Sequence, residues 1–211
     1  MEPQPLLNAL HLAERLKDAT RHCDTSGGRR ESVAEHSWRL ALLAYWMHDD
    51  FPELDIQKVI RMCLIHDLGE AFTGDIPSFD KTREDEAREQ ALLLDWVRTL
   101  PEPFSTEMAA LYREMVSLQT PEARLYKALD NLEAVIQHNE SDLSTWSEHE
   151  FSLNRTYGYD KAGFSPVMLA LRNAVREETE GRIRDYAQRT QTPLLNEKAG
   201  EECKYAHCDR R

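Results

Sequence analysis

The sequence predicts an all-α protein with a single domain. Apolar residues recur at helical spacing along most of the chain, and the alternation typical of a half-buried strand is scarce. Glycine and proline are few and fall between the helical stretches. With 211 residues, of which 41% are hydrophobic, the chain is long enough to build one buried core. We therefore expect a helical bundle over residues 1–189, followed by a mobile polar tail over residues 190–211.

Two helices are expected in the N-terminal part of the chain, over residues 5–19 and 32–47, with a glycine-containing loop over residues 23–30 between them. Ser32 can cap the second helix, and Glu35 follows three residues later, which is the capping-box pattern. The apolar residues of this helix recur at a spacing that places them on one face, and His36 lies on the same face.

A third helix is expected over residues 56–72, with Asp55 as its N-cap. Its apolar stripe begins at Ile56, Val59, Ile60 and Cys63. Continuing this spacing leads to His66 or Asp67 and then to Glu70. Two adjacent ligand-type side chains in an apolar stretch are costly to bury unless something satisfies them, and a divalent metal ion would do so.

The remaining pattern is also helical, with breaks at proline and glycine. Helices are expected over residues 81–99, 105–118, 121–140 and 166–188, with a loop over 73–77 and a less regular segment over 141–163. Asp130 lies beside the apolar stripe of the helix over 121–140. That helix is the third element to carry a candidate metal ligand.

The ordered set His36, His66, Asp67 and Asp130 predicts a site for one divalent ion, because imidazole and carboxylate suit Mn, Co, Zn and Mg. Each residue taken alone has a structural explanation. A lone inward histidine is more often a satisfied core residue, and Asp67 can pair with an arginine. Asp130 can act as a cap or pair with Lys127 or Arg124. Their occurrence together, followed by Glu70 and Asp75, favours the metal.

Bulk charge and cysteine usage restrict the partners and the compartment. The net charge of −12 argues against general affinity for nucleic acid, and no segment has the run of apolar residues that a membrane span needs. The N-terminus lacks the pattern of a secretion signal, so we expect a cytoplasmic protein. Four cysteines form no disulfide framework in a chain of this size. Cys203 and Cys208, with His207 beside them, are a weaker metal candidate because no second ligand pair exists.

Four strings in order resemble the HD-domain superfamily of metal-dependent phosphohydrolases, and most closely its 5′-deoxynucleotidases. They are Glu31-Ser32-Val33-Ala34-Glu35-His36, His66-Asp67-Leu68-Gly69-Glu70, Gly74-Asp75-Ile76-Pro77 and Lys127-Ala128-Leu129-Asp130. The resemblance implies an all-helical fold, a single divalent metal, release of phosphate from nucleoside 5′-monophosphates, and a homodimer. No histidine lies between Asp67 and Asp130, where dinuclear members of the superfamily carry additional ones, and this argues for one metal.

Further roles follow from the resemblance and from spacing. Glu70 lies one turn after His66 and can orient or deprotonate the attacking water, and Asp75 can position the substrate or protonate the leaving oxygen. Arg21 matches the phosphate-binding arginine of the deoxynucleotidase pattern. His22 stands where that pattern has tryptophan, which leaves the preference for deoxyribose open. Lys127, one turn before Asp130, can fix that carboxylate or remain solvated.

Three alternatives stay open from the sequence. The first is an HD-domain phosphohydrolase that acts on another phosphate ester or on guanosine polyphosphate. The second is a metal-holding nucleotide sensor or helical scaffold without turnover, against which the presence of Glu70 and Asp75 argues. The third is a metal-free bundle whose inward polar residues pair with one another.

Overall fold

The computed structural model describes residues 3–77 and 79–190 and confirms the predicted helical fold. Its α-helices are α1 Pro3–Glu14, α2 Val33–Trp46, α3 Ile56–Ile65, α4 Glu70–Thr73, α5 Arg83–Val97, α6 Phe104–Ser117, α7 Pro121–Glu140, α8 Glu148–Thr156, α9 Tyr159–Ala162 and α10 Pro166–Thr190. The described residues also contain three 3₁₀ turns, η1 Arg15–Lys17, η2 His48–Asp50 and η3 Leu143–Thr145, and two strands, β1 Thr20–Asp24 and β2 Arg30–Ser32. The predicted tail beyond Thr190 lies outside the described residues, as do Cys203, His207 and Cys208.

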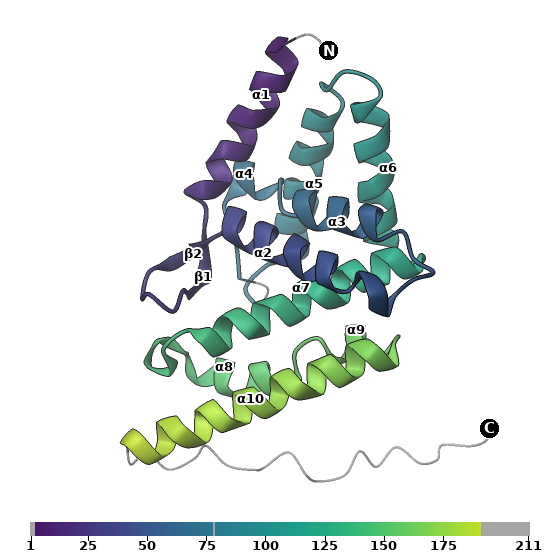
Figure 1. Cartoon of the computed structure of the whole chain (residues 1–211). Helices are drawn as coiled ribbons and strands as arrows, with labels where there is room; N and C mark the ends of the chain where they lie inside the picture. Colours follow the sequence, from purple (N-terminus) through teal and green to yellow (C-terminus); the bar gives the residue numbers. More distant parts are fainter. Residues whose placement is uncertain (1–2, 78, 191–211) are drawn as a thin grey trace, which may run out of the picture.

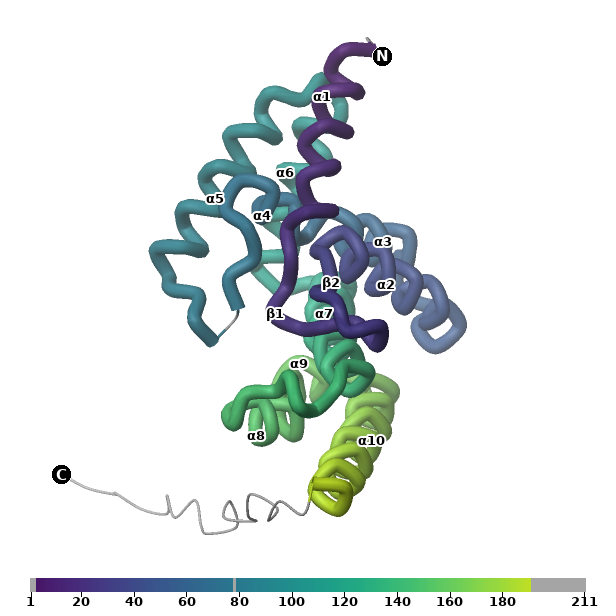
Figure 2. The backbone as a smooth tube through the Cα atoms, turned by 90° about the vertical axis from the view of Figure 1, so that its left-hand side faces the viewer, coloured from purple at the N-terminus to yellow at the C-terminus, as the bar shows by residue number. Residues whose placement is uncertain are grey.

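Helices α2, α3 and α7 form the centre of the molecule (Figure 1). Helices α1, α5 and α6 extend to one side of this centre, and α8, α9 and α10 cover the opposite side of α7. The view turned by 90° shows the same order, with α8 and α10 on one side of α7 and α1, α5 and α6 on the other (Figure 2). Helix α7 is therefore in contact with both halves of the bundle.

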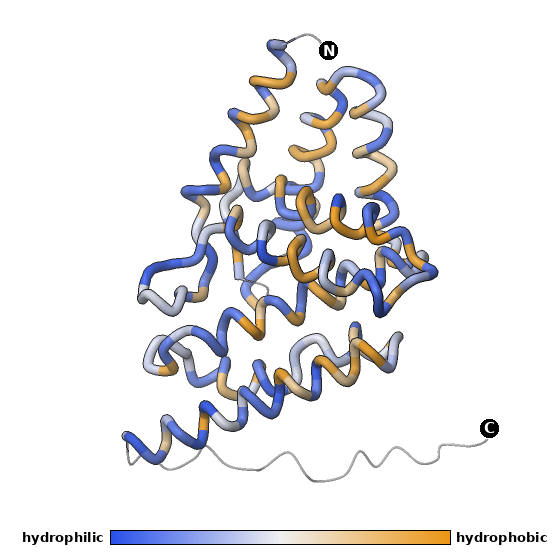
Figure 3. The backbone as a smooth tube through the Cα atoms, viewed as in Figure 1, coloured by the Kyte–Doolittle hydropathy of each residue, from blue (hydrophilic) through white to orange (hydrophobic). Residues whose placement is uncertain are grey.

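The core lies where α2, α3 and α7 meet. Its fully buried members include Leu40, Val59, Met62, Leu125, Leu129 and Leu132. Hydrophobic residues are frequent along α3, whereas the C-terminal part of α10 is mainly hydrophilic (Figure 3). Burial of this apolar surface is the main favourable contribution to the stability of the bundle. Among the described residues, no helix combines the length and the apolar character needed to cross a membrane.

Two predicted helix starts are confirmed by their hydrogen bonds. The Ser32 hydroxyl accepts from the amide of Glu35 at 3.2 Å, and the Glu35 carboxylate accepts from the amide of Ser32 at 2.9 Å. Asp55 accepts from the amide of Lys58 at 3.0 Å at the start of α3. Both caps satisfy backbone donors that have no partner inside the helix, and they fix where α2 and α3 begin.

The prediction of one helix over 5–19 and a loop over 23–30 was wrong in part. Helix α1 ends at Glu14, a 3₁₀ turn follows, and β1 pairs antiparallel with β2 in a short hairpin. Gly28 adopts a left-handed φ of 78° in the connecting turn. The strand pattern is too short to be distinguished from a loop, because the pairing depends on packing of the hairpin against α2 and α7.

The single helix expected over 56–72 is interrupted at the ligand pair. Helix α3 ends at Ile65, and α4 begins only at Glu70. Between them the backbone forms tight turns, in which the amide of Leu68 donates to Ile65 at 3.2 Å and that of Glu70 donates to Asp67 at 3.0 Å. The residues of one continuous helix would point about 100° apart, whereas this turn aims neighbouring side chains at one point. The segment over 141–163, expected to be irregular, contains η3, α8 and α9.

Candidate metal centre and its cavity

The four residues predicted as metal ligands come together from three elements. His36 lies in the first turns of α2, His66 and Asp67 in the turn after α3, and Asp130 in the middle of α7. Ligand atoms of His36, His66 and Asp67 all lie within 4.8 Å of one another. The Asp130 Oδ1 atom lies 3.2 Å from His36 Nε2 and 3.6 Å from His66 Nε2. The structure thus places the predicted set around one point.

Hydrogen bonds on the far side of each imidazole fix which nitrogen faces that point. The Nδ1 atom of His66 lies 2.9 Å from the carbonyl oxygen of Cys63, which can only accept, so this nitrogen carries the proton. The Nδ1 atom of His36 bonds to the carboxylate of Glu133. In the neutral form both Nε2 atoms therefore present a lone pair to the centre, the state in which histidine binds metals.

This arrangement fits a divalent cation. His66 Nε2 lies 2.9 Å from Asp67 Oδ2, so two acceptor atoms face each other unless a positive charge lies between them. This contact lacks hydrogen-bond geometry, and the buried Nε2 atom of His66 has no hydrogen-bond partner within residues 3–77 and 79–190. Burial alone would lower the pKa of His66, yet the carboxylates of Asp67 and Asp130 raise it to about 10. The site therefore favours positive charge strongly.

Glu133 is a buried residue of this cluster that the sequence did not single out. It is 1% exposed, and its two carboxylate oxygens bond to His36 Nδ1 and, at 2.6 Å, to Arg39 Nε. Glu133 follows Asp130 by three residues on α7, so both carboxylates lie on one helix face. A second inward acid one turn beyond a candidate ligand was the available signal. Lys127, one turn before Asp130, bonds to its Oδ2 atom at 2.7 Å.

The predicted catalytic acids lie beside the ligands. Glu70 is buried at the start of α4, and burial, followed by the charges of Asp67 and Asp75, raises its pKa to about 10. Its Oε2 atom has no hydrogen-bond partner in the described part of the chain. Gly74 then turns the chain with a φ of 74°, which favours glycine, and Asp75 returns to the cavity wall. Burial also raises the pKa of Asp75.

Arg21 reaches the same cavity from β1. Its Nη1 atom lies 3.5 Å from Glu31 Oε2 and 3.6 Å from Glu133 Oε2, without hydrogen-bond geometry to any described residue. Lys81 is a second cation that the sequence analysis did not single out, and its Nζ atom lies 4.0 Å from Glu70 Oε1 and 2.7 Å from Glu89 Oε2. Both cations offer donors to an anionic group beside the ligands.

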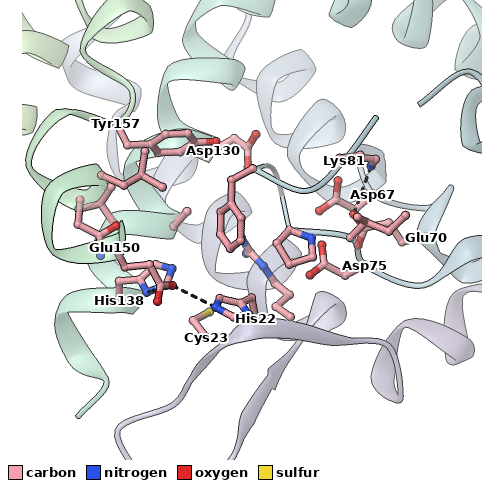
Figure 4. A pocket seen from close by; sticks show the side chains of 18 of the residues that line it. His22, Cys23, Asp67, Glu70, Asp75, Lys81, Asp130, His138, Glu150 and Tyr157 are labelled. Atoms are coloured by element: carbon pink, nitrogen blue, oxygen red, sulfur yellow. Dashed lines mark ion pairs between the residues drawn. The ribbon is translucent and has the colours of Figure 1, made fainter. Parts of the chain in front are cut away.

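Arg21, Lys81 and the acids Glu70 and Asp75 line one cavity of about 260 Å³. Asp67, Glu70, Asp75 and Lys81 lie on one side of it, and a second group of polar residues lies on the opposite side (Figure 4). That second group consists of His22, His138, Glu150 and Tyr157. The cavity can therefore hold an anion at the metal end and a larger polar group at the other end.

Comparison with known proteins supports the resemblance seen in the four strings. A family model described as "HD domain" matches residues 13–172. The 5′-deoxynucleotidase HDDC2 of Xenopus laevis is 30% identical over 167 residues, which cover 77% of this chain and 80% of that protein. Human 5′-deoxynucleotidase HDDC2 is 32% identical over 114 residues, and the match spans only 55% of its length.

Solved structures show the same fold. A protein of Magnetospirillum magnetotacticum, described as a predicted metal-dependent phosphohydrolase, superposes with a TM-score of 0.72 at 27% sequence identity. The superposition covers 84% of this chain and 92% of the other.

Proposed function

This chain belongs to the HD-domain family, and we propose that it is a metal-dependent phosphohydrolase releasing phosphate from (deoxy)nucleoside 5′-monophosphates. One observation carries this proposal. Two imidazoles and two carboxylates from three elements converge at the end of a cavity that Arg21, Glu70 and Asp75 also line. The 5′-deoxynucleotidases to which the chain is similar support the choice of substrate.

His36, His66, Asp67 and Asp130 would hold one divalent ion. The ion when bound would polarise a phosphate oxygen and lower the pKa of a water molecule, so that a nucleophile forms near neutral pH. Imidazole and carboxylate suit Mn, Co, Zn and Mg, so the ligand types alone leave the metal open among these. Glu133 and the Cys63 carbonyl would keep the two imidazoles in the binding tautomer.

The chain's other residues supply positioning and proton transfer. Arg21 would donate to the phosphate, since its buried Nη1 atom has no hydrogen-bond partner among the described residues. Glu70 lines the same cavity, and its Oε2 atom has no hydrogen-bond partner among the described residues. With the cation bound, whose charge would lower the raised pKa of this carboxyl group, Glu70 would orient the attacking water and take its proton. Asp75, whose pKa burial raises, would position the substrate or give a proton to the leaving 5′-oxygen.

The test is phosphate release from ribo- and deoxyribonucleoside 5′-monophosphates by metal-stripped protein, with Mn, Co, Zn or Mg added back. We expect metal-dependent release from 5′-monophosphates and none from 3′-monophosphates or cyclic nucleotides. Asp67→Ala should lose both bound metal and turnover. Turnover retained in Asp67→Ala would refute the metal assignment. Bound metal without any release would favour a sensor or a different phosphate ester.

We further propose that the protein acts as a cytoplasmic homodimer. Trp38 and Tyr45 are seven residues apart on α2, hence on one face, and Trp46 adjoins them; they are 62%, 59% and 66% exposed. Exposed apolar patches of this kind support association, here with a second copy. The free thiols of Cys23 and Cys63 accord with a reducing compartment. Light scattering should give twice the mass of one chain, and Trp38→Arg should halve it.

A further inference from the structure

The end of the cavity opposite the candidate metal ligands carries polar groups that the proposed hydrolysis does not use. His22 from β1, His138 from α7 and Glu150 from α8 meet there (Figure 4). Glu150 is 2% exposed, although carboxylates are seldom buried without a partner of opposite charge. This end of the cavity is therefore built around a buried acid.

The Glu150 carboxylate is held in a fixed orientation. Its Oε2 atom accepts from the backbone amide of Ser147 at 2.6 Å, the second half of a capping box at the start of α8. Its Oε1 atom lies 3.3 Å from His22 Nε2 and 3.7 Å from His138 Nδ1, both of which line the cavity. The capping bond thus leaves one oxygen facing the other residues of this end.

The neighbours of Glu150 leave hydrogen-bonding capacity for a ligand. Burial lowers the pKa of His138 to about 4, so this imidazole is neutral at physiological pH and does not compensate the carboxylate. Asn154 lies one turn after Glu150 on α8, lines the same cavity, and is 2% exposed. Its amide nitrogen has no hydrogen-bond partner in the part of the chain that the structure describes. Buried polar atoms in native proteins are generally satisfied, so a polar ligand group is expected here.

The walls at this end suit a flat ring. The rings of His22 and Phe79 meet edge to face, with centroids 5.4 Å apart, and Leu153 and Tyr157 also line the cavity. Planar apolar faces with a few placed polar groups are typical of sites for heterocycles.

We propose that this end is a nucleobase subsite in which Glu150 accepts a hydrogen bond from the exocyclic amino group of the base. The inference rests on the proposed function, because the phosphate at the metal end would direct the nucleoside toward α8. Adenine, cytosine and guanine carry an amino donor, whereas thymine and uracil present a carbonyl oxygen at the corresponding edge. A carboxylate has no proton to offer that oxygen, so it favours the amino-bearing bases.

The sharpest comparison is dCMP with dUMP, which differ at C4, where an amino group replaces a carbonyl oxygen, and at N3, which carries a proton only in uracil. We expect kcat/KM for dCMP to exceed that for dUMP about tenfold or more, the range of a hydrogen bond to a charged group. Glu150→Gln should bring the ratio to one or below, because the single amide oxygen keeps the bond to the Ser147 amide and the NH2 group that then faces the base is a donor, which suits the carbonyl oxygen of uracil. Glutamine also serves in a capping box, so α8 is expected to stay intact. Glu148→Gln, on the same helix but exposed and outside the cavity lining, is the matched control.

A binding measurement separates this inference from the hydrolysis itself. Calorimetry should show deoxycytidine binding more tightly than deoxyuridine to the wild type, with the difference lost in Glu150→Gln and kept in Glu148→Gln. Equal kcat/KM for dCMP and dUMP, or a preference that survives Glu150→Gln, would refute the subsite while leaving the proposed function standing. Absence of release from every monophosphate would refute the proposed function, and the subsite inference with it.

Discussion

Replacing Glu133 by glutamine is expected to weaken divalent-metal binding about tenfold to hundredfold while the protein stays folded. The Glu133 carboxylate accepts from two donors at once, His36 Nδ1 through one oxygen and Arg39 Nε through the other. Glutamine has the same shape but only one oxygen, so its amide group must face one of these donors. If it faces His36, the imidazole loses the partner that fixes its tautomer. The expected loss in affinity corresponds to about 1.4–2.7 kcal/mol.

Titration calorimetry of metal-stripped protein with Mn²⁺ would measure this change. Glu140→Gln is the matched control, since Glu140 also bonds to Arg39 but does not contact His36, and its side chain is 45% exposed. Thermal unfolding of both variants would establish that each is folded at the titration temperature. A metal Kd in Glu133→Gln equal to that of the wild type, with the fold intact, would refute the argument that this carboxylate orients His36.

Glu70→Gln should lower kcat by roughly two orders of magnitude or more with metal still bound, as loss of an acid–base group does; metal lost together with activity would make Glu70 a support of the ligands instead. Leu129→Ala should destabilise the protein by about 2–5 kcal/mol in chemical denaturation, because Leu129 is a fully buried residue of α7 in the hydrophobic core. The exposed Val116→Ala should change stability by less than about 0.5 kcal/mol, and equal effects of the two would contradict this account of the core. The metal-free protein should lose stability as pH rises from 6.5 to about 10. Burial alone would lower the pKa of His66, but the carboxylates of Asp67 and Asp130 raise it from 6.5 to about 10. Within this pH range the folded state therefore keeps a proton that the unfolded state releases. Denaturation across this window, with and without Mn²⁺, would measure it, and a rising stability would disprove it.

Local features of the fold were predictable because each depends on residues a few positions apart. The capping box of Ser32 and Glu35 and the N-cap of Asp55 involve side chains that bond to the backbone within three residues. The apolar spacing of α7 likewise places Leu125, Leu129 and Leu132 on a buried face. The HD-domain strings could be recognised in the same way, since residue type and order suffice for a resemblance.

The break between α3 and α4 shows where local reasoning stops. The spacing of Ile56, Val59 and Cys63 continues into His66 and Asp67, and nothing in the sequence near them, apart from Gly69, opposes a longer helix. Packing of the ligand turn against α2 and α7 overrides the helical pattern there. The hairpin of β1 and β2 is a similar case, because two strands of this length gain stability mainly from the helices they pack against.

Residue type and spacing along the chain indicate that the protein is helical, where most of its helices begin, and which four residues are candidate metal ligands. The tertiary structure decided that His36, His66, Asp67 and Asp130 meet, that Glu133 orients one imidazole, and that Glu150 closes the far end of the cavity. These contacts join residues that are far apart in the sequence; His36 and Glu133, for example, are separated by 97 positions. Periodicity and capping act over one or two turns of helix, whereas the convergence of side chains from separate elements depends on how the whole core packs.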